Sequence, residues 1–337
     1  MKVEFLQIEP TTRCNFTCGF CCGRQMTQSD LREDTFARVL DALPDLRHIE
    51  LLGEGEPLLH PRFFDMARQA LKRGLRVSFI TNGSLLSPSV VDQILGLGFW
   101  DVSISLESAD PEVFRNLRGG KLEKVIEGVR RLVAARDARK LKRPAIGFAL
   151  TVLRRTLGDL SAIRSLYRDL GLDGGIGIQL LQGMEPYVRC YDEEMSAQRF
   201  RPEEIRQVRA TIKNSGLREL DVTMREQGFY QELFSGWTPS SGTCPWLERG
   251  LYVNRDGFVT GCCTIKEAEH AFGRIGVDSL STILKRRDRT RRELAKPHIP
   301  ASCRGCRVAE AIYASNGPSR KYLKLALALD KNRITKL

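Results

Sequence analysis

The stretch "TTRCNFTCGFCCGR" at residues 11–24 holds four of the ten cysteines of this 337-residue chain. It directly follows the alternating segment "VEFLQI" (3–8), which predicts a β-strand. Five of the other six cysteines lie beyond residue 240, where Cys303 and Cys306 form a C-x2-C pair. Such clustering is typical of metal ligands. The sequence therefore indicates two metal-binding cysteine groups, one near each end of the chain.

Composition and charge narrow the class of protein. Hydrophobic residues make up 42% and charged residues 28%, as in ordinary globular proteins. No run reaches the roughly 18 apolar residues of a membrane span, and the first residues carry no apolar signal core. We therefore expect a cytoplasmic protein without a membrane segment, where thiols bind metals more often than they form disulfides.

The net charge of +12 is concentrated in the basic segments 135–143 and 284–292. Neither segment contains the interleaved aromatic residues of a nucleic-acid stacking surface. The basic segments are therefore interpreted as solvated helix faces, or as a preference for an anionic small substrate, and nucleic acid is not expected as a partner.

Strand-like and helix-like segments alternate through the first 182 residues. Predicted strands cover 3–8, 48–52, 76–80, 101–106, 145–152 and 175–180, and predicted helices cover 32–43, 61–73, 88–97, 111–116, 122–135 and 157–170. Repeated β-α units predict a parallel sheet. Six units would form an open barrel and eight a closed one, but a doubly wound sheet has the same rhythm, so periodicity alone leaves the choice open.

The rhythm breaks after residue 182. We expect a barrel domain at 1–182, a linker with helical segments at 183–243, a cysteine-bearing domain at 244–310 and a helical tail at 311–337. Within these regions, 202–214 and 322–330 read as helices and 219–224 as a strand.

Cys14, Cys18 and Cys21 have the spacing C-x3-C-x2-C in the loop after the first predicted strand. In parallel α/β folds the loops at the carboxyl ends of strands carry the site. Zinc sites usually use four ligands in pairs, whereas three thiolates on an iron–sulfur cubane leave one iron open for another ligand.

The triplet resembles the signature of the radical S-adenosylmethionine enzymes, whose fold is a partial (β/α)6 TIM-like barrel. The resemblance implies a [4Fe-4S] cluster on Cys14, Cys18 and Cys21, with S-adenosylmethionine chelated by the open iron. In that family an electron from the cluster splits S-adenosylmethionine, and the resulting 5′-deoxyadenosyl radical takes a hydrogen atom from a substrate C–H bond. The resemblance also implies an external reductant such as flavodoxin or ferredoxin.

A second motif, "GEGEP" (53–57), resembles the family's GGEP motif and follows the second predicted strand. The resemblance implies that Gly55, Glu56 and Pro57 hold the methionine amino group through backbone carbonyls. Glycine permits a close approach of the backbone, and proline restricts the turn.

Further cofactor contacts are expected after the fourth predicted strand, in "SISLES" (103–108). Ser105 and Glu107 alternate onto one face and are candidates for contacts to the ribose or the carboxylate; ordinary half-buried strand residues are the alternative. By the same resemblance, Arg118 is a candidate partner of the methionine carboxylate.

The C-terminal cysteines follow the pattern C-x12-G-x4-C … C-x2-C. "LYVNRDGFVTGCC" (251–263) predicts a β-hairpin with Asp256-Gly257 at its turn. The residues alone fit a zinc ribbon. The pattern is similar to the SPASM extension, or to its shorter twitch form, and this resemblance implies one auxiliary [4Fe-4S] cluster. Its ligands would be Cys244, Cys262, Cys303 and Cys306, with Cys263 as the alternative to Cys262.

An auxiliary cluster ligated by four cysteines has no open iron, so it suits electron relay rather than substrate binding. Relatives with one such cluster dehydrogenate a carbinol or invert a stereocentre. The function expected from the resemblance is oxidation of a carbinol in a sugar or aminocyclitol substrate of natural-product biosynthesis. The alternatives are epimerisation of a sugar or peptide, with Cys190 as hydrogen donor, and radical decarboxylation of an acidic sugar.

Cys190 follows the last predicted strand by ten residues, so it is a candidate to lie over the barrel mouth; an incidental buried cysteine is the alternative. Because the barrel begins at residue 3, we expect no leader-binding module, which favours a small polar substrate. A non-catalytic zinc-ribbon protein that binds nucleic acid is the remote alternative. It would show strongly salt-dependent binding, and it leaves the GEGEP loop unexplained.

Overall fold

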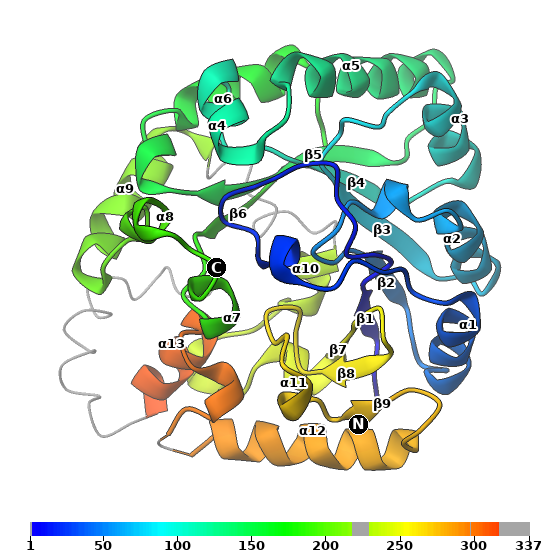
Figure 1. Cartoon of the computed structure of the whole chain (residues 1–337), viewed down its shortest axis with the longest axis vertical. Helices are drawn as coiled ribbons and strands as arrows, with labels where there is room; N and C mark the ends of the chain where they lie inside the picture. Colours follow the sequence, from blue (N-terminus) through cyan, green and yellow to red (C-terminus); the bar gives the residue numbers. More distant parts are fainter. Residues whose placement is uncertain (1, 218–228, 297, 317–337) are drawn as a thin grey trace.

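The computed structural model describes residues 2–217, 229–296 and 298–316, in which one curved sheet forms the centre (Figure 1). The strand order is β6-β5-β4-β3-β2-β1-β7-β8-β9. The bounds are β1 Phe5–Ile8, β2 His48–Leu51, β3 Arg76–Thr81, β4 Asp101–Ser105, β5 Ala145–Val152, β6 Ile176–Leu180, β7 Gly250–Val253, β8 Phe258–Thr260 and β9 Gly273–Arg274. The predicted strand 219–224 and the predicted tail helix 322–330 fall outside the described residues.

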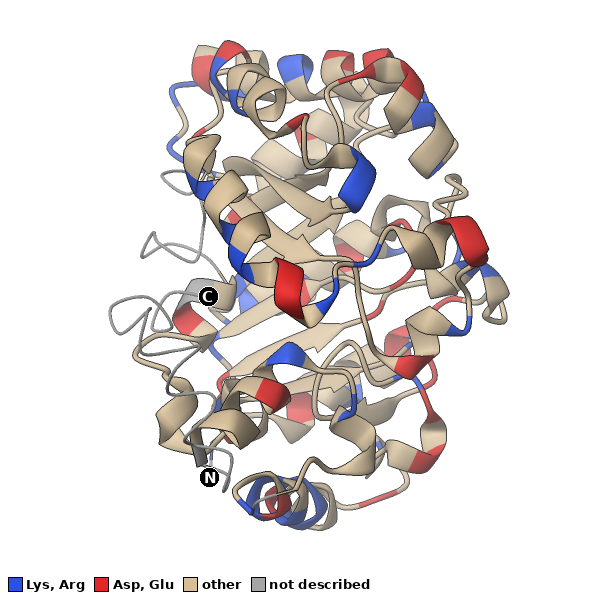
Figure 2. Ribbon diagram, turned by 90° about the vertical axis from the view of Figure 1, so that its left-hand side faces the viewer, with Lys and Arg blue, Asp and Glu red and all other residues tan. Residues whose placement is uncertain are grey.

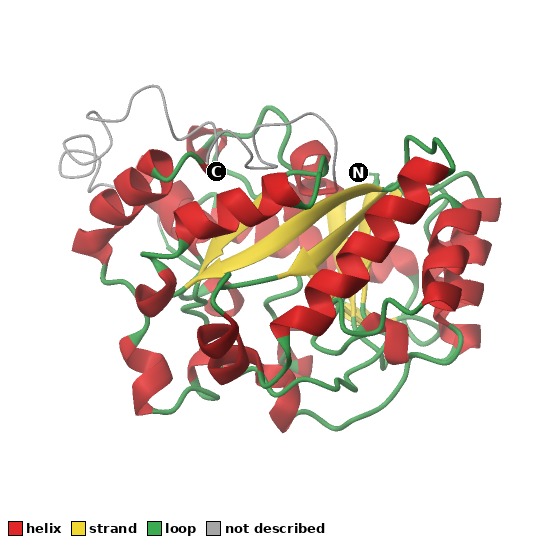
Figure 3. Ribbon diagram, turned by 90° about the horizontal axis from the view of Figure 1, so that it is seen from above, coloured by secondary structure: helices red, strands yellow, loops and turns green. Residues whose placement is uncertain are grey.

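The helices that follow β1 to β6 cover the outside of the sheet, whereas α10 (Phe229–Leu233) packs against its inner face through Phe229. Those of the first half are α1 Glu33–Ala42, α2 Phe63–Lys72, α3 Pro88–Leu97, α4 Pro111–Arg118, α5 Leu122–Ala138 and α6 Leu160–Asp169. Those of the second half are α7 Glu185–Val188, α8 Glu193–Ala197, α9 Ile205–Asn214, α10 Phe229–Leu233, α11 Pro245–Arg249, α12 Leu280–Leu294 and α13 Arg307–Asn316. The charged residues lie mainly on these helices and on loops (Figure 2), and from above the strands lie inside a ring of helices (Figure 3).

The strand order decides between the two folds that the periodicity left open. From β1 to β6 every strand pairs in parallel with its neighbour in the sequence. Because parallel crossovers are right-handed, a sheet whose strands keep their sequence order has all the crossover helices on one face. A doubly wound sheet reverses its strand order and has helices on both faces. The result is an open, partial barrel. All six predicted strands are present, with ends within two residues of those expected.

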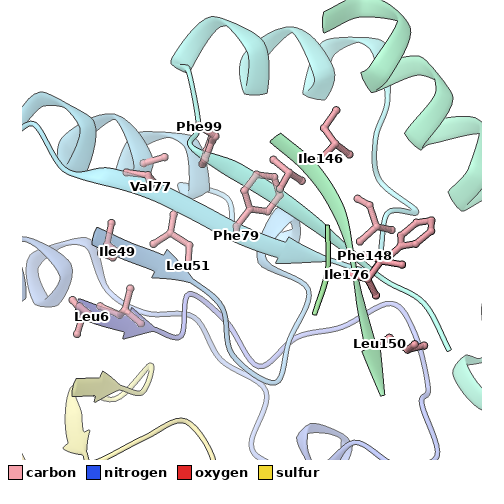
Figure 4. Close-up of a cluster of buried hydrophobic side chains, with 14 of the residues drawn as sticks. Leu6, Ile49, Leu51, Val77, Phe79, Phe99, Ile146, Phe148, Leu150 and Ile176 are labelled. Carbon is pink, nitrogen blue, oxygen red and sulfur yellow. The ribbon is translucent and has the colours of Figure 1, made fainter. Parts of the chain in front are cut away.

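The two faces of the barrel strands differ in polarity. Outward-facing side chains form the apolar core under the helices (Figure 4), where the buried Phe79 ring lies 5.1 Å from Phe63 and 4.9 Å from Phe99. The alternate positions are polar: Gln7 donates a 2.8 Å hydrogen bond to Glu50, which is paired with Ser78 on the next strand. The inner face of the sheet thus carries polar groups such as Gln7 and Glu50, and beside them Phe5 packs against Phe229 and Trp246 in a smaller apolar cluster.

The predicted hairpin is confirmed: β7 and β8 pair antiparallel, and Gly257 has a φ of +84° in the turn, a conformation that favours glycine. The sequence did not predict where the hairpin lies. β7 pairs in parallel with β1, with Phe5 opposite Gly250 and Ile8 opposite Val253. The sheet thus continues from the N-terminal barrel into the cysteine-bearing C-terminal region.

Phe79→Ala should lower the free energy of unfolding by about 3–5 kcal/mol, because it removes a fully buried ring from an aromatic cluster. Val277→Ala is the matched control, since Val277 is 74% exposed and should change stability little. Urea unfolding followed by circular dichroism measures both. Equal effects of the two substitutions would contradict the packing described here.

Candidate active site

The N-terminal cysteine loop lies between β1 and the 3-10 turn Cys22–Gln25, and it packs against the end of α4. The backbone N–H of Thr17 donates to the carbonyl of Arg118 at 3.0 Å. A Cβ on Gly119 would lie 2.0 Å from the Thr17 hydroxyl oxygen, and one on Gly120 would lie 2.2 Å from the Phe16 ring. The "RGG" sequence after α4 therefore leaves the room that this loop needs.

The three predicted ligands of this loop are free cysteines with different exposure: Cys14 is exposed, Cys18 is buried and Cys21 is half-buried. Burial raises the pKa of Cys18 to about 11, so iron binding, which needs thiolates, must release protons. Among the described residues, no three His, Cys, Asp or Glu side chains form a group that could hold a metal ion. A cubane binds each thiolate through a different iron, so its ligands stand farther apart than those of a single ion.

The GEGEP loop is fixed against the same cysteine loop. Gly55 N–H donates to the Thr11 carbonyl at 3.2 Å, and a Cβ on Gly55 would lie 2.3 Å from that oxygen, so only glycine fits. The Glu56 side chain is buried and accepts 2.7 Å hydrogen bonds from the Thr81 hydroxyl and from the Asn82 backbone N–H. This carboxylate thus joins the loops after β2 and β3.

Glu107 and Arg118 form a buried ion pair, with 2.5 Å between Arg118 Nη1 and Glu107 Oε2. The Glu107 side chain is therefore engaged within the protein, while Ser105 is half-buried at the end of β4. The buried Arg118 Nε has no hydrogen-bond partner among the described residues. A buried guanidinium with a free donor fits an anionic group, such as a carboxylate, beside the cysteine loop.

The four C-terminal cysteines expected as ligands lie around one cavity. Cys244 precedes α11, Cys262 follows β8, and Cys303 and Cys306 precede α13. The other residues that line this cavity are mostly apolar, among them Met184, Trp246, Leu247, Ile265 and Leu294. Four thiols around one apolar cavity fit a cluster ligated entirely by cysteine.

The structure separates Cys262 from its neighbour Cys263. Cys262 lines the cavity and Cys263 does not. Burial raises the pKa of Cys263, and the charged groups that also influence it include Glu50, which belongs to the barrel strand β2. The geometry therefore favours Cys262 over Cys263 as the ligand of the auxiliary cluster.

Cys190 lies two residues beyond α7 and contacts the turn that follows the N-terminal cysteine loop. Its thiol is 3.2 Å from the Pro186 carbonyl and 3.3 Å from Gln25 Oε1. Burial raises its pKa although the side chain is only half-buried. The structure thus places Cys190 against the turn that follows the first cysteine group, with its S–H engaged by protein oxygens, and its location over the barrel mouth stays a prediction.

Two residues of the site were not predicted, Glu54 and Lys266. Lys266 Nζ lies 2.7 Å from Glu54 Oε1, which also accepts a 2.7 Å hydrogen bond from the Tyr187 hydroxyl. Burial alone would raise the pKa of Glu54, but Lys266 and the hydrogen bonds outweigh burial and lower it. The sequence signal that could have indicated Glu54 is its place as a charged residue inside the GEGEP motif.

Comparisons with known families agree with this geometry. The model of the radical SAM superfamily matches residues 8–141, and the SPASM model, an iron–sulfur cluster-binding domain, matches residues 244–307. The chain thus carries a radical SAM domain followed by a SPASM domain. Its cofactors are S-adenosylmethionine, a [4Fe-4S] cluster and an auxiliary iron–sulfur cluster.

Curated relatives that match part of the chain have names that describe different reactions. The chain is 30% identical over 185 residues to the tungsten-containing aldehyde ferredoxin oxidoreductase cofactor-modifying protein of Pyrococcus furiosus, covering 53% of this chain and 52% of the relative. It is 31% identical over 169 residues to the AdoMet-dependent heme synthase of Methanosarcina barkeri, covering 48% and 46%. The chain thus spans about half the length of the curated relatives it matches, and none of these names describes oxidation of a sugar.

Solved structures share the fold. A structure of anSMEcpe with bound AdoMet and a peptide has a TM-score of 0.66 at 15% identity, covering 98% of both chains. Streptococcus suis SuiB has a TM-score of 0.64 at 13% identity, covering 84% of this chain and 65% of SuiB. No helix in the described part of the chain is long and apolar enough to cross a membrane.

Cys262→Ala and Cys263→Ala form a matched pair that tests the C-terminal ligand set. After anaerobic reconstitution, Cys262→Ala should lose about half of the bound iron because one cluster of two loses a ligand. Cys263→Ala should keep the wild-type amount. Iron and sulfide analysis measures both, and the reverse pattern would show that Cys263 is the ligand.

Proposed function

We propose that this chain is a radical SAM oxidoreductase that oxidises a carbinol C–H to a ketone. The observation that carries the proposal is the apolar cavity lined by Cys244, Cys262, Cys303 and Cys306. A cluster with four thiolates has no position left for substrate, so it suits electron transfer. When bound, the N-terminal cluster with S-adenosylmethionine supplies a hydrogen-abstracting radical, and the C-terminal cluster supplies an electron acceptor.

The residues proposed to hold the N-terminal cofactors are Cys14, Cys18 and Cys21 for iron, with the backbone of Gly55, Glu56 and Pro57 and the side chain of Arg118 for S-adenosylmethionine. The free Nε of Arg118 supports its assignment to the methionine carboxylate. Three aromatic rings lie 5.9 Å from the Arg118 guanidinium, those of Phe16, Phe20 and Phe114. These rings exclude water, which strengthens the attraction between the guanidinium and a carboxylate.

The inner face of the barrel offers space for a small substrate. Ser105, Ala149 and Gly177 are paired across β4, β5 and β6, and all three are half-exposed. The row crosses the inner face from Ser105 at the carboxyl end of β4, and in barrel folds substrates bind at the carboxyl ends of the strands. This row supports a small polar substrate, and the Ser105 hydroxyl is a candidate donor to it.

The surface near the auxiliary cysteines suits an acidic reductant such as flavodoxin or ferredoxin. Arg304 and Arg307 flank Cys306 and are exposed. The nearby segment 280–296, which contains α12 at the bottom of Figure 2, has seven basic and two acidic residues, and all of the basic ones except the buried Arg287 reach the surface. Such a surface raises the association rate of an acidic protein and makes that rate sensitive to salt.

Epimerisation with Cys190 as hydrogen donor is the second candidate. Its support is the position of Cys190 beside the turn that follows the first cysteine loop. We rank oxidation ahead because the Cys190 thiol is already bonded to two protein oxygens. Radical decarboxylation has no separate support in the geometry.

Cys303→Ala should retain uncoupled cleavage of S-adenosylmethionine but form no ketone, because radical generation and electron acceptance belong to different cysteine groups. Cys18→Ala should lose both. 5′-Deoxyadenosine is measured by chromatography, and products from a panel of aminocyclitols and sugars are measured by mass spectrometry. If a folded Cys303→Ala protein no longer cleaved S-adenosylmethionine, radical generation and electron acceptance would not belong to separate cysteine groups.

Cys190→Ala separates the two candidate reactions. For an oxidase, the ketone should form at a rate within about twofold of wild type, and no deuterium should enter the product in D2O. For an epimerase, wild type should place one solvent deuterium at the inverted carbon, and Cys190→Ala should abolish that incorporation. The second pattern would overturn the ranking.

A further inference from the structure

A buried carboxylate connects the N-terminal cysteine loop with the C-terminal domain. Glu54 Oε2 lies 3.3 Å from the Cys21 thiol, and Glu54 Oε1 lies 2.7 Å from Lys266 Nζ. The Glu54 and Lys266 side chains are only 11% and 9% exposed. Because Lys266 follows Cys262 by four residues, one ion pair joins the segments that carry the two groups of proposed ligands.

The contact between Glu54 and Cys21 changes from a hydrogen bond to a repulsive contact when Cys21 binds iron. A thiol can donate a hydrogen bond to the carboxylate, but an iron-bound thiolate has no proton to donate. Two negatively charged groups would then lie within van der Waals distance of each other, with little water to screen them. A carboxylate at this position needs a compensating cation.

Lys266 is placed to be that cation. Its ammonium lies 3.5 Å from the Tyr252 hydroxyl and 4.9 Å from the centre of the Tyr252 ring, so β7 fixes its position. Tyr187 donates to the same Glu54 oxygen from α7. Buried charges of opposite sign that are held in this way influence each other far more strongly than surface pairs do.

We propose that Lys266 is a positioning residue that neutralises Glu54 and thereby sets the reduction potential of the N-terminal cluster. The inference rests on Cys21 as a ligand of that cluster and goes beyond the proposed reaction. Adding an electron to a cluster is harder beside an uncompensated negative charge, and charge near a cluster is an established determinant of its potential. Through this pair the C-terminal domain controls how easily the N-terminal cluster is reduced.

The proposal predicts opposite signs for two single substitutions. Lys266→Met leaves Glu54 uncompensated and should shift the potential to more negative values. Glu54→Gln leaves Lys266 uncompensated and should shift it to more positive values. Each shift should reach at least a tenfold change in the reduced-to-oxidised ratio, or about 59 mV for one electron. The double variant Glu54→Gln/Lys266→Met should return close to wild type, because it removes both charges.

The experiment is a redox titration of the reconstituted full-length protein, followed by electron paramagnetic resonance. The N-terminal cluster is identified as the signal that changes when S-adenosylmethionine is added. Arg136→Met is the matched control, since Arg136 is buried on the outer helix α5 and pairs with Asp173 at 2.8 Å, away from either cysteine group in the sequence. Arg136→Met should leave the potential unchanged. This result would show that the effect of Lys266→Met comes from a charge near the cluster, and not from the loss of a buried cation in general.

If the Glu54–Lys266 pair only holds the two segments together, the two single variants should leave the potential unchanged or shift it in the same direction. Either result overturns the proposal. If the Lys266→Met protein does not retain its N-terminal cluster, its potential cannot be measured. The iron content of the double variant then tests the proposal instead. Recovery of the iron in the double variant supports neutralisation, and failure to recover it overturns the proposal. Wild-type protein without an S-adenosylmethionine-sensitive signal would instead refute the cofactor assignment itself.

Discussion

The parallel pairing of β1 with β7 is the contact on which the arrangement of the site depends. β1 leads directly into the N-terminal cysteine loop, and β7 begins the hairpin that leads to Cys262. Without this pairing, nothing in the sheet would bring the C-terminal hairpin to the barrel. With it, Tyr252 and Lys266 are placed beside Glu54, which contacts Cys21 of the N-terminal group.

Close contacts between loop backbones position the N-terminal cysteines. Gly55 approaches Thr11, and Gly119 and Gly120 approach Thr17 and Phe16, at distances that no side chain would allow. The motif glycines and the "RGG" sequence therefore have a common physical explanation. They let three loops from different strands pack together around the cysteine triplet, and Glu56 fixes one of these loops to the next strand.

The barrel and its cysteine groups could be predicted from the sequence because their signals are local. Strands such as Ala145–Val152 show the expected apolar character, and the cysteine spacings occur within short segments. The pairing of β1 with β7 could not be predicted, because a short hairpin strand carries no signal for a partner about 245 residues away. The same limit applies to Glu54 and Lys266, which meet only after that pairing forms. The choice between Cys262 and Cys263 depended on which of two adjacent side chains faces the cavity, and a residue count does not determine this.

If both cysteine groups hold iron–sulfur clusters, the anaerobically reconstituted wild-type protein should contain about eight irons per chain, all in [4Fe-4S] clusters, with one cluster responding to S-adenosylmethionine. Iron and sulfide analysis combined with Mössbauer spectroscopy measures this. About four irons per chain, or zinc in place of iron at the C-terminal cysteines, would show that one of the two groups does not hold such a cluster.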